Sequence, residues 1–433
     1  MSFDGIPITF DELLLSAVSL GLGGAVLVWS VRHGRHLVLP LAAALVIRAL
    51  VAVAHRLWNV VPQGRSDAVR FERFAWEWSQ SGCGRVWEHL HLSGSYVYSY
   101  ILGELYACTA RAPLMAQMLN VVLGVWIVYL IARTTQMVWG RDAAVRIAWV
   151  AAVFPALIIY STVTLREVWV VVGFMSGVYF LVRWVECGRT SCFAMAIAGF
   201  LVASLFHGAM FFAVVAVMGV LMVQALGALL RLPRVGSAKR SVVGGALFSV
   251  VLGTFAYGGL DQLHLSSVGD LYRLGDDGLG TIEAVGGAGM RGGTAYPEYL
   301  MPRGEVDIIW QTVPRMAYLL IGPPPWEVTS PALLIGFLDS LFYILAIVLL
   351  WRYRHRWWHR PELRLLFVIG LSLTFVYGWG TSNFGTGLRH RAKFVGLLMI
   401  MVAGLLGRRA RRAPRAPPER VRRTDSTPVR GKA

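Results

Sequence analysis

Four short groups of polar and ionisable residues lie between long apolar stretches, and their residue types suit phosphate binding and proton transfer. The groups are residues 66–78, 160–167, 206–208 and 380–393. Arginine guanidinium groups match phosphate oxygens with paired hydrogen bonds, and a carboxylate can accept a proton from an attacking hydroxyl group. Ionisable side chains near the membrane interior are expensive, which makes these groups functional candidates by default.

The first group predicts an amphipathic helix over residues 66–78 that lies on the outer surface of a membrane. Helical spacing stacks Asp67 over Phe71 and Arg70 over Phe74. One interpretation makes Asp67 a general base held at the bilayer surface. The alternative is an interfacial helix whose charges are only solvated.

The second and third groups occupy short turns between apolar stretches. Arg166 and Glu167 must lie close to the outer membrane boundary, because almost no loop separates the flanking spans. Arg166 is a candidate ligand for an anionic head group, with Glu167 as the residue that orients it. The alternative is a snorkelling pair that caps the turn. A lone histidine at a turn usually has a structural role, so His207 is assigned only a supporting one.

The fourth group, residues 380–393, combines small residues with cationic side chains. Glycine and other small residues let backbone amides approach a phosphate. Arg389 and Arg391 are candidate phosphate ligands, and His390 adds positive charge on a face where the positive-inside rule disfavours it. Asn383 is a supporting candidate in the same stretch.

These groups must be positioned by membrane helices, because the chain is too apolar for an ordinary soluble enzyme. Its 433 residues are 56% hydrophobic and 15% charged, with a mean hydropathy of +0.58, whereas soluble domains carry about 25% charge. Apolar runs of about 17 to 25 residues recur along the chain, and they predict an all-α polytopic membrane protein with about eleven transmembrane helices. The expected spans are 11–31, 37–54, 113–132, 145–162, 167–184, 192–206, 209–230, 242–258, 331–351, 363–380 and 392–407.

The distribution of charge predicts the orientation of these helices. Lys and Arg total 41 against 24 Asp and Glu, a net charge of +17, and most of the excess lies in short connectors and in the tail 408–433. Nucleic acid is therefore not an expected partner. The positive-inside rule places the connectors and the tail in the cytoplasm of a multi-pass inner (plasma) membrane protein, where a disordered basic tail meets anionic membrane lipids.

Two long segments, 55–112 and 259–330, then face outward. The second holds nine acidic residues against four arginines, the opposite balance from the connectors. Residues 96–110 are too short and polar for a span, but they suit an interfacial or re-entrant helix with tyrosines at headgroup depth. We therefore expect an integral membrane domain over 1–407 whose two outer loops contain short interfacial helices.

The remaining polar residues support fewer inferences. The four cysteines are too few and scattered for a disulfide framework, and Cys187 and Cys192 have the wrong spacing for a common zinc pair, so we expect all four to be structural bystanders. They are Cys83, Cys108, Cys187 and Cys192. Arg48 is the main charge inside a predicted span and is expected to snorkel to one surface. No cluster of metal ligands stands out, which predicts metal independence. The first apolar run follows acidic rather than basic residues, so we expect it to be retained as a helix.

Three of these features resemble polytopic bacterial envelope glycosyltransferases of the C-type (GT-C) superfamily, which use polyprenyl-phosphate-linked sugars, and related polysaccharide polymerases. The first is an acidic residue in an early outer loop before an aromatic-rich helix, here 67–78. The second is the turn that contains Pro155, Ser161 and 165–167. The third is the late element 383–391, beside a Pro-Pro-Trp sequence. The resemblance extends over most of residues 55–407.

The resemblance implies roles for individual residues. Asp67 corresponds to the catalytic base, and Arg166, Arg389 and Arg391 correspond to ligands of the lipid-linked phosphate. In many of these enzymes the acidic loop follows the first helix and contains two close acidic residues, whereas here it follows the second span. Glu72 and Glu104 therefore remain alternative catalytic carboxylates.

The predicted function is a glycosyltransferase (hexosyl or pentosyl) that moves a sugar from a polyprenyl phosphate or diphosphate to a cell-envelope glycan or lipid-linked acceptor on the outer face. Such an enzyme needs a lipid-facing groove, cations for the leaving phosphate and a carboxylate for the acceptor proton. No cofactor is expected besides the lipid-linked donor. A lipid-linked oligosaccharide polymerase is an alternative that the sequence does not separate. A flippase or transporter predicts charges along a path through the bilayer, whereas most ionisable residues here gather at one face. A scaffold without catalysis is a further alternative.

Overall fold

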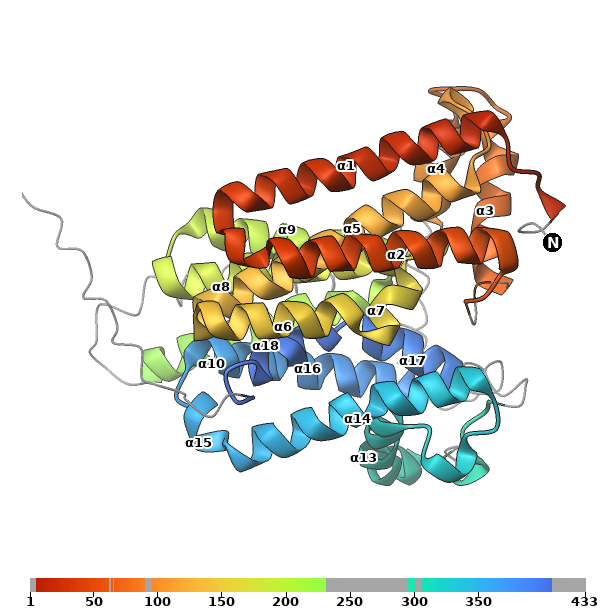
Figure 1. Ribbon diagram of the computed structural model, residues 1–433. Helices are drawn as coiled ribbons and strands as arrows, with labels where there is room; N and C mark the ends of the chain where they lie inside the picture. The colour runs from red at the N-terminus through yellow and green to blue at the C-terminus, as the bar shows by residue number, and fades with distance from the viewer. Residues whose placement is uncertain are drawn as a thin grey trace, which may run out of the picture.

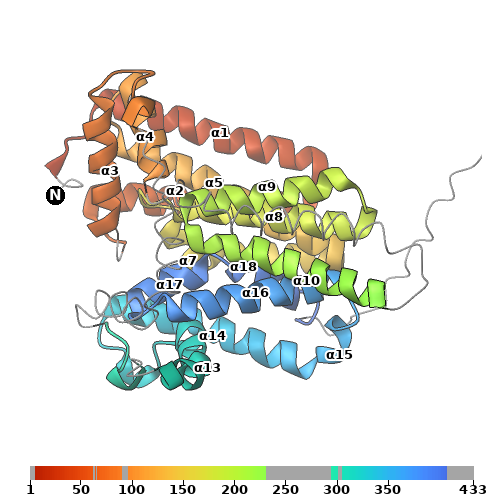
Figure 2. The ribbon, with the colours of Figure 1, turned by 180° about the vertical axis from the view of Figure 1, so that it is seen from behind.

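Apart from one isolated β-bridge, every regular element of the described chain is a helix. The computed structural model describes residues 5–61, 64, 66–89, 96–230, 294–300 and 305–406. The long helices run side by side, and α3 (Ser66–Ser79) crosses one end of the bundle (Figures 1 and 2). Helices satisfy their backbone hydrogen bonds internally, as a lipid environment requires. The predicted all-α class is confirmed for these residues.

Seven helical segments in the described part of the chain are long and apolar enough to cross a bilayer. They are α1 (Phe10–Gly34), α2 (Val38–Trp58) with η2 (Arg35–Leu37), α5 (Pro113–Trp139), α8 (Glu167–Cys187), α10 (Phe211–Leu230) with η4 (Gly208–Met210), α14 (Pro331–Arg352) and α16 (Pro361–Trp379). Three other predicted spans coincide with shorter or broken helices. These are α6 (Arg141–Val153) followed by α7 (Pro155–Tyr160), α9 (Thr190–Phe206) and α18 (Val395–Val402). The predicted span 242–258 lies outside the described residues, so the count of about eleven stays a prediction.

The break between α6 and α7 explains why Arg48 is buried in the bundle. Pro155 has no backbone N–H and leaves the carbonyl of Ala151 without its helical partner. Arg48 Nη2 donates to that carbonyl at 3.1 Å, and Nη1 donates to the carbonyl of Ala152 at 2.7 Å. Its Nε donates to Ser161 Oγ at 3.1 Å. The expected snorkelling of Arg48 is therefore wrong, because its buried guanidinium caps α6.

The first outer segment folds into a hairpin of α3 and α4 (Val97–Cys108), with η3 (Val86–His89) between them. The helix predicted over 66–78 is confirmed as α3. Tyr98, Tyr100 and Tyr106 are at most 3% exposed, so other parts of the protein cover their rings. Tyr100, for example, stacks on Trp78 of α3 at 4.2 Å between ring centroids. The expected position of the tyrosines at headgroup depth stays a prediction.

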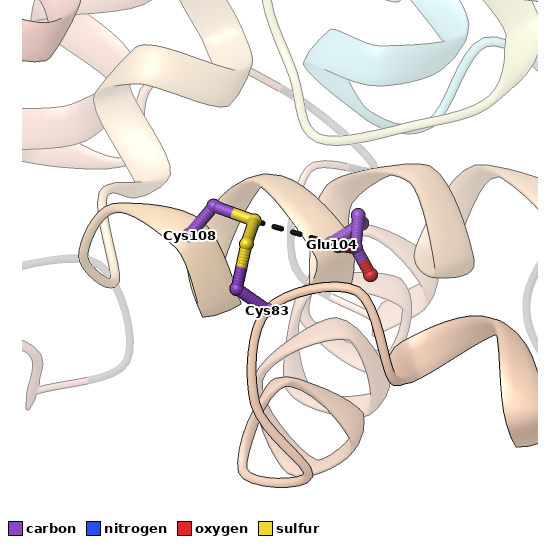
Figure 3. Close-up of side chains that lie close together, drawn as sticks. All are labelled: Cys83, Glu104 and Cys108. Carbon is purple, nitrogen blue, oxygen red and sulfur yellow. Dashed lines mark hydrogen bonds between the residues drawn. A yellow bond between two sulfur atoms is a disulfide. The ribbon is translucent and has the colours of Figure 1, made fainter.

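A disulfide closes this hairpin, which corrects the expectation that all cysteines are bystanders. Cys83, in the turn after α3, is bonded to Cys108 at the end of α4, with the Cα atoms 4.6 Å apart (Figure 3). Beside this bond, Glu104 accepts a hydrogen bond from the backbone N–H of Gly84 at 2.5 Å. Disulfides persist in oxidising compartments and are rare in the cytosol. The bond agrees with an outward-facing segment 55–112.

The connector between α8 and α9 lies at the opposite end of the bundle (Figure 1), and the other two cysteines, at the helix ends that it joins, are free thiols. Cys187 ends α8 and Cys192 lies in the first turn of α9, and their sulfur atoms are 3.7 Å apart. This connector is cytoplasmic in the predicted topology, and the cytosol keeps thiols reduced. The two cysteine pairs thus agree with opposite sides of the membrane.

The second outer segment is described from residue 294 onward and contains η5 (Glu298–Leu300), α13 (Glu305–Ile321) and η6 (Pro325–Glu327). Buried Arg315 in α13 donates to the carbonyls of Leu300 at 2.7 Å and Gly378 at 3.1 Å. It also donates to the carbonyl of Thr381 at 2.8 Å, and so fastens α13 to the end of α16. Residues 259–293 and the predicted tail 408–433 lie outside the described residues.

Replacing Cys83 and Cys108 with serine should loosen the α3–α4 hairpin. The disulfide joins residues 25 apart, and closing a loop of this length stabilises a fold by about 3 kcal/mol. We expect a lower thermal unfolding midpoint and faster limited proteolysis of the purified double variant. The matched control, Cys187→Ser with Cys192→Ser, should leave both unchanged, and equal effects of the two pairs would contradict the assignment.

Candidate functional site

Three segments from distant parts of the chain meet at the end of the bundle that carries α3. They are α3, the turn between α7 and α8, and α17 (Phe384–Ala392), which lie at the same end in Figures 1 and 2. Thr164 Oγ1 in the turn donates to the carbonyl of Ala68 in α3 at 3.0 Å. Asn120 Nδ2 of α5 donates to the carbonyl of Val163 at 2.6 Å. These bonds fix the start of α8, and with it Glu167, against α3.

Arg389 is the centre of the site, because it binds one carboxylate from each of the other two segments. Its Nη1 donates to Asp67 Oδ2 at 2.5 Å, and its Nε donates to Glu167 Oε1. We call these three residues the charge triad. Burial alone would lower the pKa of Arg389, but the two carboxylates raise it, so the guanidinium stays charged. The side chain of Asp67 is 42% exposed and that of Glu167 only 1%, so Asp67 is the accessible carboxylate.

A cavity of about 290 Å³ opens beside the charge triad. This volume is near the lower end of the range for small-molecule sites, about 300–1,000 Å³. One part of its wall is polar, and another part is apolar. The polar part contains Asp67, Thr294, Asn383, Thr386 and Arg389, and the apolar part contains Leu165, Pro323, Leu333 and Leu388. Such a mixed wall suits a ligand that has both a charged group and an apolar group.

The first turn of α17 forms part of the polar wall. Asn383 is the N-cap of this helix, because its side chain accepts a hydrogen bond from the N–H of Thr386 at 2.7 Å. The N–H of Phe384 donates to the carbonyl of Thr294 at 2.9 Å, next to the bridge between Ala295 and Asn383. The N-terminus of a helix carries partial positive charge and favours anions. The supporting role expected of Asn383 therefore takes the form of a helix cap at the cavity.

Arg391 occupies a different position from Arg389, although the sequence predicts both as phosphate ligands. It is 1% exposed, and its Nε donates to Asp339 Oδ2 of α14 at 3.0 Å. Its Nη1 donates to the carbonyl of Gly322 at 2.6 Å, and Nη2 donates to that of Gly336 at 2.5 Å. All three nitrogens are occupied, so Arg391 fastens α17 to α14 and is not available as the predicted phosphate ligand. The sequence motifs do not identify its partner Asp339 as a functional residue. The feature that points to Asp339 is its position as a single carboxylate within an apolar span.

Arg166 lies beside the charge triad without joining it. Its guanidinium carbon is 5.4 Å from the centre of the Phe71 ring. Burial lowers the pKa of Arg166, and the Glu167 carboxylate raises it again only in part. Arg166 is not among the described residues that line the cavity. Its contact with phosphate stays a prediction, whereas the partner that Glu167 orients in this structure is Arg389.

His390 and His207, which are partly buried, form a cluster with the buried Tyr377 behind the charge triad. Thr381 Oγ1 lies 2.8 Å from His390 Nδ1, and the two imidazole centroids are 5.4 Å apart. The Tyr377 ring lies 4.6 Å from that of His390. Burial, followed by the charge of Lys393, lowers the pKa of both histidines well below the ordinary value. Both imidazoles are therefore neutral near pH 7, and His390 does not add the positive charge expected of it.

Lys393 is a buried member of the site that the sequence marks only as one of the cationic side chains of the fourth group. It is 1% exposed, and its Nζ has no hydrogen-bond partner among the described residues. Oε2 of Glu167 likewise has none in this part of the chain. Both side chains and Arg389 line a small cavity of about 10 Å³, and about 10–15 Å³ is enough for one water molecule. A lysine at the start of an apolar run was the available signal.

The two alternative bases lie apart from the charge triad. Glu72 is 1% exposed and binds Arg111 through both carboxylate oxygens, at 3.0 and 2.8 Å. Glu104 lies beside the disulfide (Figure 3). Neither is among the described residues that line the 290 Å³ cavity. The geometry therefore favours Asp67 over both.

One group of potential metal ligands with suitable spacing occurs in the described residues. It comprises Cys83, Glu104 and Cys108, whose ligand atoms lie within 4.8 Å of one another. Thiolates bind metals, but both sulfur atoms here belong to the disulfide (Figure 3). This group therefore does not offer a thiolate ligand in the oxidised protein, and the metal independence of the reaction stays a prediction.

Replacing Arg389 with methionine should destabilise the protein, because Glu167 then loses the partner that compensates its buried charge. Removing one partner of a buried ion pair costs about 3–5 kcal/mol. The double variant Arg389→Met with Glu167→Gln removes the stranded charge and should recover much of the loss. Thermal unfolding of the purified variants measures both effects. A double variant no more stable than Arg389→Met would speak against the charge triad.

The two partly buried histidines, His207 and His390, should make stability depend on pH. Their folded pKa values are lowered, so the unfolded chain binds more protons than the folded protein once the pH falls below about 6.5. Stability should therefore be complete above about pH 7 and decline as the pH falls through about 6.5. The variant His390→Gln should show a shallower decline in thermal unfolding. An unchanged pH profile would mean that His390 is not buried as a neutral group.

Comparisons with known proteins found one similar fold. No protein family model matches the chain, and no curated protein matches it. The structure is similar to that of the oligosaccharyltransferase of Archaeoglobus fulgidus, solved with a tethered acceptor peptide that contains the NVT sequon, with a TM-score of 0.43 and 16% sequence identity. The match covers 84% of this chain and 49% of the archaeal chain, so this chain spans about half the length of that protein.

Proposed function

We propose that this protein is a membrane glycosyltransferase that moves a sugar from a polyprenyl phosphate or diphosphate carrier to an envelope glycan or lipid-linked acceptor. The observation that carries the proposal is the pairing of Asp67 with Arg389 on the wall of one cavity. Transfer from a phosphate carrier needs a group that accepts the proton of the acceptor and a group that stabilises the leaving phosphate. An exposed carboxylate and a charged guanidinium supply these two functions.

In the proposed reaction, the acceptor hydroxyl oxygen forms a bond to the anomeric carbon while the bond between this carbon and the carrier phosphate oxygen breaks. The phosphate leaves with the electron pair of that bond, and Asp67 takes the proton of the acceptor hydroxyl. Arg389 stabilises the negative charge on the leaving phosphate. Its Nε and Nη1 donate to Glu167 and Asp67, whereas Nη2 donates to no described residue and is the nitrogen left for the phosphate.

Glu167 has a positioning role in this proposal. Its carboxylate is buried and binds Arg389 through Nε, whereas the exposed Asp67 binds it through Nη1. When Asp67 turns toward the acceptor, Glu167 keeps the guanidinium in place. A catalytic group held by a buried partner needs little reorganisation during the reaction, which is the main source of electrostatic catalysis.

The surroundings of the cavity support a lipid-linked donor. Ala332 and Leu333, in the first turn of α14, belong to its wall. Farther along the same helix, Leu334, Leu338 and Leu341 are 48%, 52% and 47% exposed. Exposed leucines on a membrane helix offer an apolar surface to a polyprenyl tail while its phosphate lies in the cavity. A water-soluble nucleotide sugar has no use for such a surface.

The protein lies in the inner (plasma) membrane, and the proposed site faces the side away from the cytoplasm. The positive charge of the connectors predicts this orientation. The disulfide between Cys83 and Cys108 supports it, because the bond lies in the same outer hairpin as Asp67. The free thiols of Cys187 and Cys192 lie at the other end of the bundle, on the side assigned to the cytoplasm.

The alternative functions differ in how the described residues support them. A lipid-linked oligosaccharide polymerase would use the same phosphate and proton-transfer chemistry with another acceptor, so it remains within the proposed class. No specific observation in the described residues favours a flippase or transporter. Arg48, the main charge inside a predicted span, is occupied in capping α6 and is not left to line a path.

The variant Asp67→Asn should lose transfer activity while it keeps its affinity for the carrier lipid. Loss of a general base lowers the rate by about 10²–10⁴-fold. Activity can be measured as glycan extension with radiolabelled polyprenyl-linked sugars extracted from the source membranes. Affinity can be measured as thermal stabilisation of the purified protein by undecaprenyl phosphate.

The matched control is Glu77→Gln, which removes an exposed carboxylate from the same helix, where Glu77 pairs with Arg73 at 3.6 Å. It should retain full activity. Turnover of Asp67→Asn at the parental rate would overturn the role of Asp67 as base. Movement of labelled lipid-linked sugar across proteoliposomes without a new glycosidic bond would favour a flippase instead.

A further inference from the structure

The short helix α15 (Arg354–Trp357) lies at the end of the bundle opposite to α3 and α17 (Figures 1 and 2). Two cavities that share wall residues lie at this end. The larger, about 620 Å³, is lined by residues of α14, α15 and α16, and the smaller, about 380 Å³, by residues of α8, α10 and α16. Trp358 and Phe367 belong to the walls of both cavities. We call the two cavities together the two-lobed groove.

The walls of the two-lobed groove are mainly apolar and aromatic. Trp351 is 73% exposed and Trp358 is 52% exposed, although both lie next to apolar membrane helices. Ile347 extends the wall of the larger lobe along α14, and Val220 extends that of the smaller lobe along α10. Tryptophan at the end of membrane helices is typical of the interface between acyl chains and headgroups. The groove therefore has the character of a site for acyl chains.

Each lobe also carries an exposed arginine of its own. Arg354, with His355 and His359, lines the larger lobe, and Arg364 lines the smaller one. The guanidinium carbon of Arg354 lies 5.3 Å from the centre of the Trp351 ring. Exposed guanidinium groups above an apolar wall form the pattern expected for lipid phosphates.

Arg360, which lies between these arginines in sequence, is occupied by the protein. Its Nη1 donates to the carbonyl of Val138 at 2.5 Å and lies 3.9 Å from Glu362 Oε1. Its guanidinium carbon is 4.5 Å from the centre of the Trp139 ring. The ion pair with Arg360 partly compensates the charge of the Glu362 carboxylate, so this carboxylate repels an anionic ligand less. The cations that remain for a ligand are therefore distributed over both lobes.

We propose that the two-lobed groove binds a diphosphatidylglycerol lipid of the cardiolipin class, with one phosphate at Arg354 and the other at Arg364. Each lobe supplies one exposed arginine for one of the two phosphates of such a lipid, and the apolar walls of the two lobes suit its acyl chains. In the predicted topology this end faces the cytoplasm, and basic pockets between membrane helices on that side bind anionic headgroups. This site is independent of the proposed transfer reaction.

Native mass spectrometry of the full chain in detergent tests this proposal with three defined lipids. Cardiolipin, phosphatidylglycerol and phosphatidylcholine are supplied at equal phosphate concentration. Cardiolipin should be retained best and phosphatidylcholine least. In the double variant Arg354→Ala with Arg364→Ala, the affinity for cardiolipin should fall by about tenfold or more, because each arginine near a lipid headgroup contributes about 1 kcal/mol.

The matched control removes two other exposed arginines from the same end of the bundle, Arg183→Ala with Arg189→Ala, which lie outside both cavity walls. It should bind cardiolipin like the parent. An equal loss in the control would show only general attraction to charge and would overturn the site. Equal retention of cardiolipin and phosphatidylglycerol would overturn the two-phosphate assignment. The charge-conserving variant Arg354→Lys should keep most of the affinity, and loss of binding there would also contradict a charge-based site.

Discussion

The ion pairs of Arg389 with Asp67 and Glu167 are the interaction on which the functional end of this protein depends. Glu167 is 1% exposed, and a carboxylate in such a place is tolerated only when a cation compensates it. Arg389 provides this compensation and at the same time reaches the exposed Asp67. Because the two carboxylates belong to α3 and α8, one guanidinium fixes the relative positions of three segments. The cavity exists where these segments meet the first turn of α14.

Other buried arginines make this arrangement of short helices stable. Arg48, Arg315 and Arg391 each donate to backbone carbonyls at places where helices break or end. Such carbonyls have no partner within their own helix, and in an apolar interior each one left unpaired is costly. The guanidinium groups supply the missing donors. The bundle can therefore contain short helices such as α7 and α17, and α17 contributes side chains to the cavity wall.

The sequence predicts the membrane helices and part of the site because both signals are local. Long apolar runs predict helices such as α5 and α14, and charges between them mark Asp67, Glu167 and Arg389. The sequence does not distinguish the role of Arg389 from that of Arg391. The two side chains point in different directions only because this segment folds as a helix. Residues two positions apart on an α-helix point about 200° apart, so one faces the cavity and the other faces α14.

Partners that are distant in sequence account for the remaining errors. The pairing of Glu72 with Arg111 and that of Cys83 with Cys108 depend on how α3 and α4 fold back on each other, and no local pattern reveals this. The buried tyrosines of α4 have the same origin, since amphipathic tyrosines suit a lipid interface and a helix contact equally well. The residue type of Asn383 makes it a candidate in the sequence. Its function as a helix cap follows only from the structure, where its side chain accepts a hydrogen bond from the N–H of Thr386.

The separation of 322 residues between Asp67 and Arg389 has a consequence for biosynthesis. The ribosome makes α3 and α8 long before α17, so during most of translation Glu167 must wait in a nascent chain without its cation. The membrane insertion machinery therefore handles an intermediate with an uncompensated acidic helix end. Any truncated product that lacks the last two helices retains this defect and is a natural target for membrane quality-control proteases.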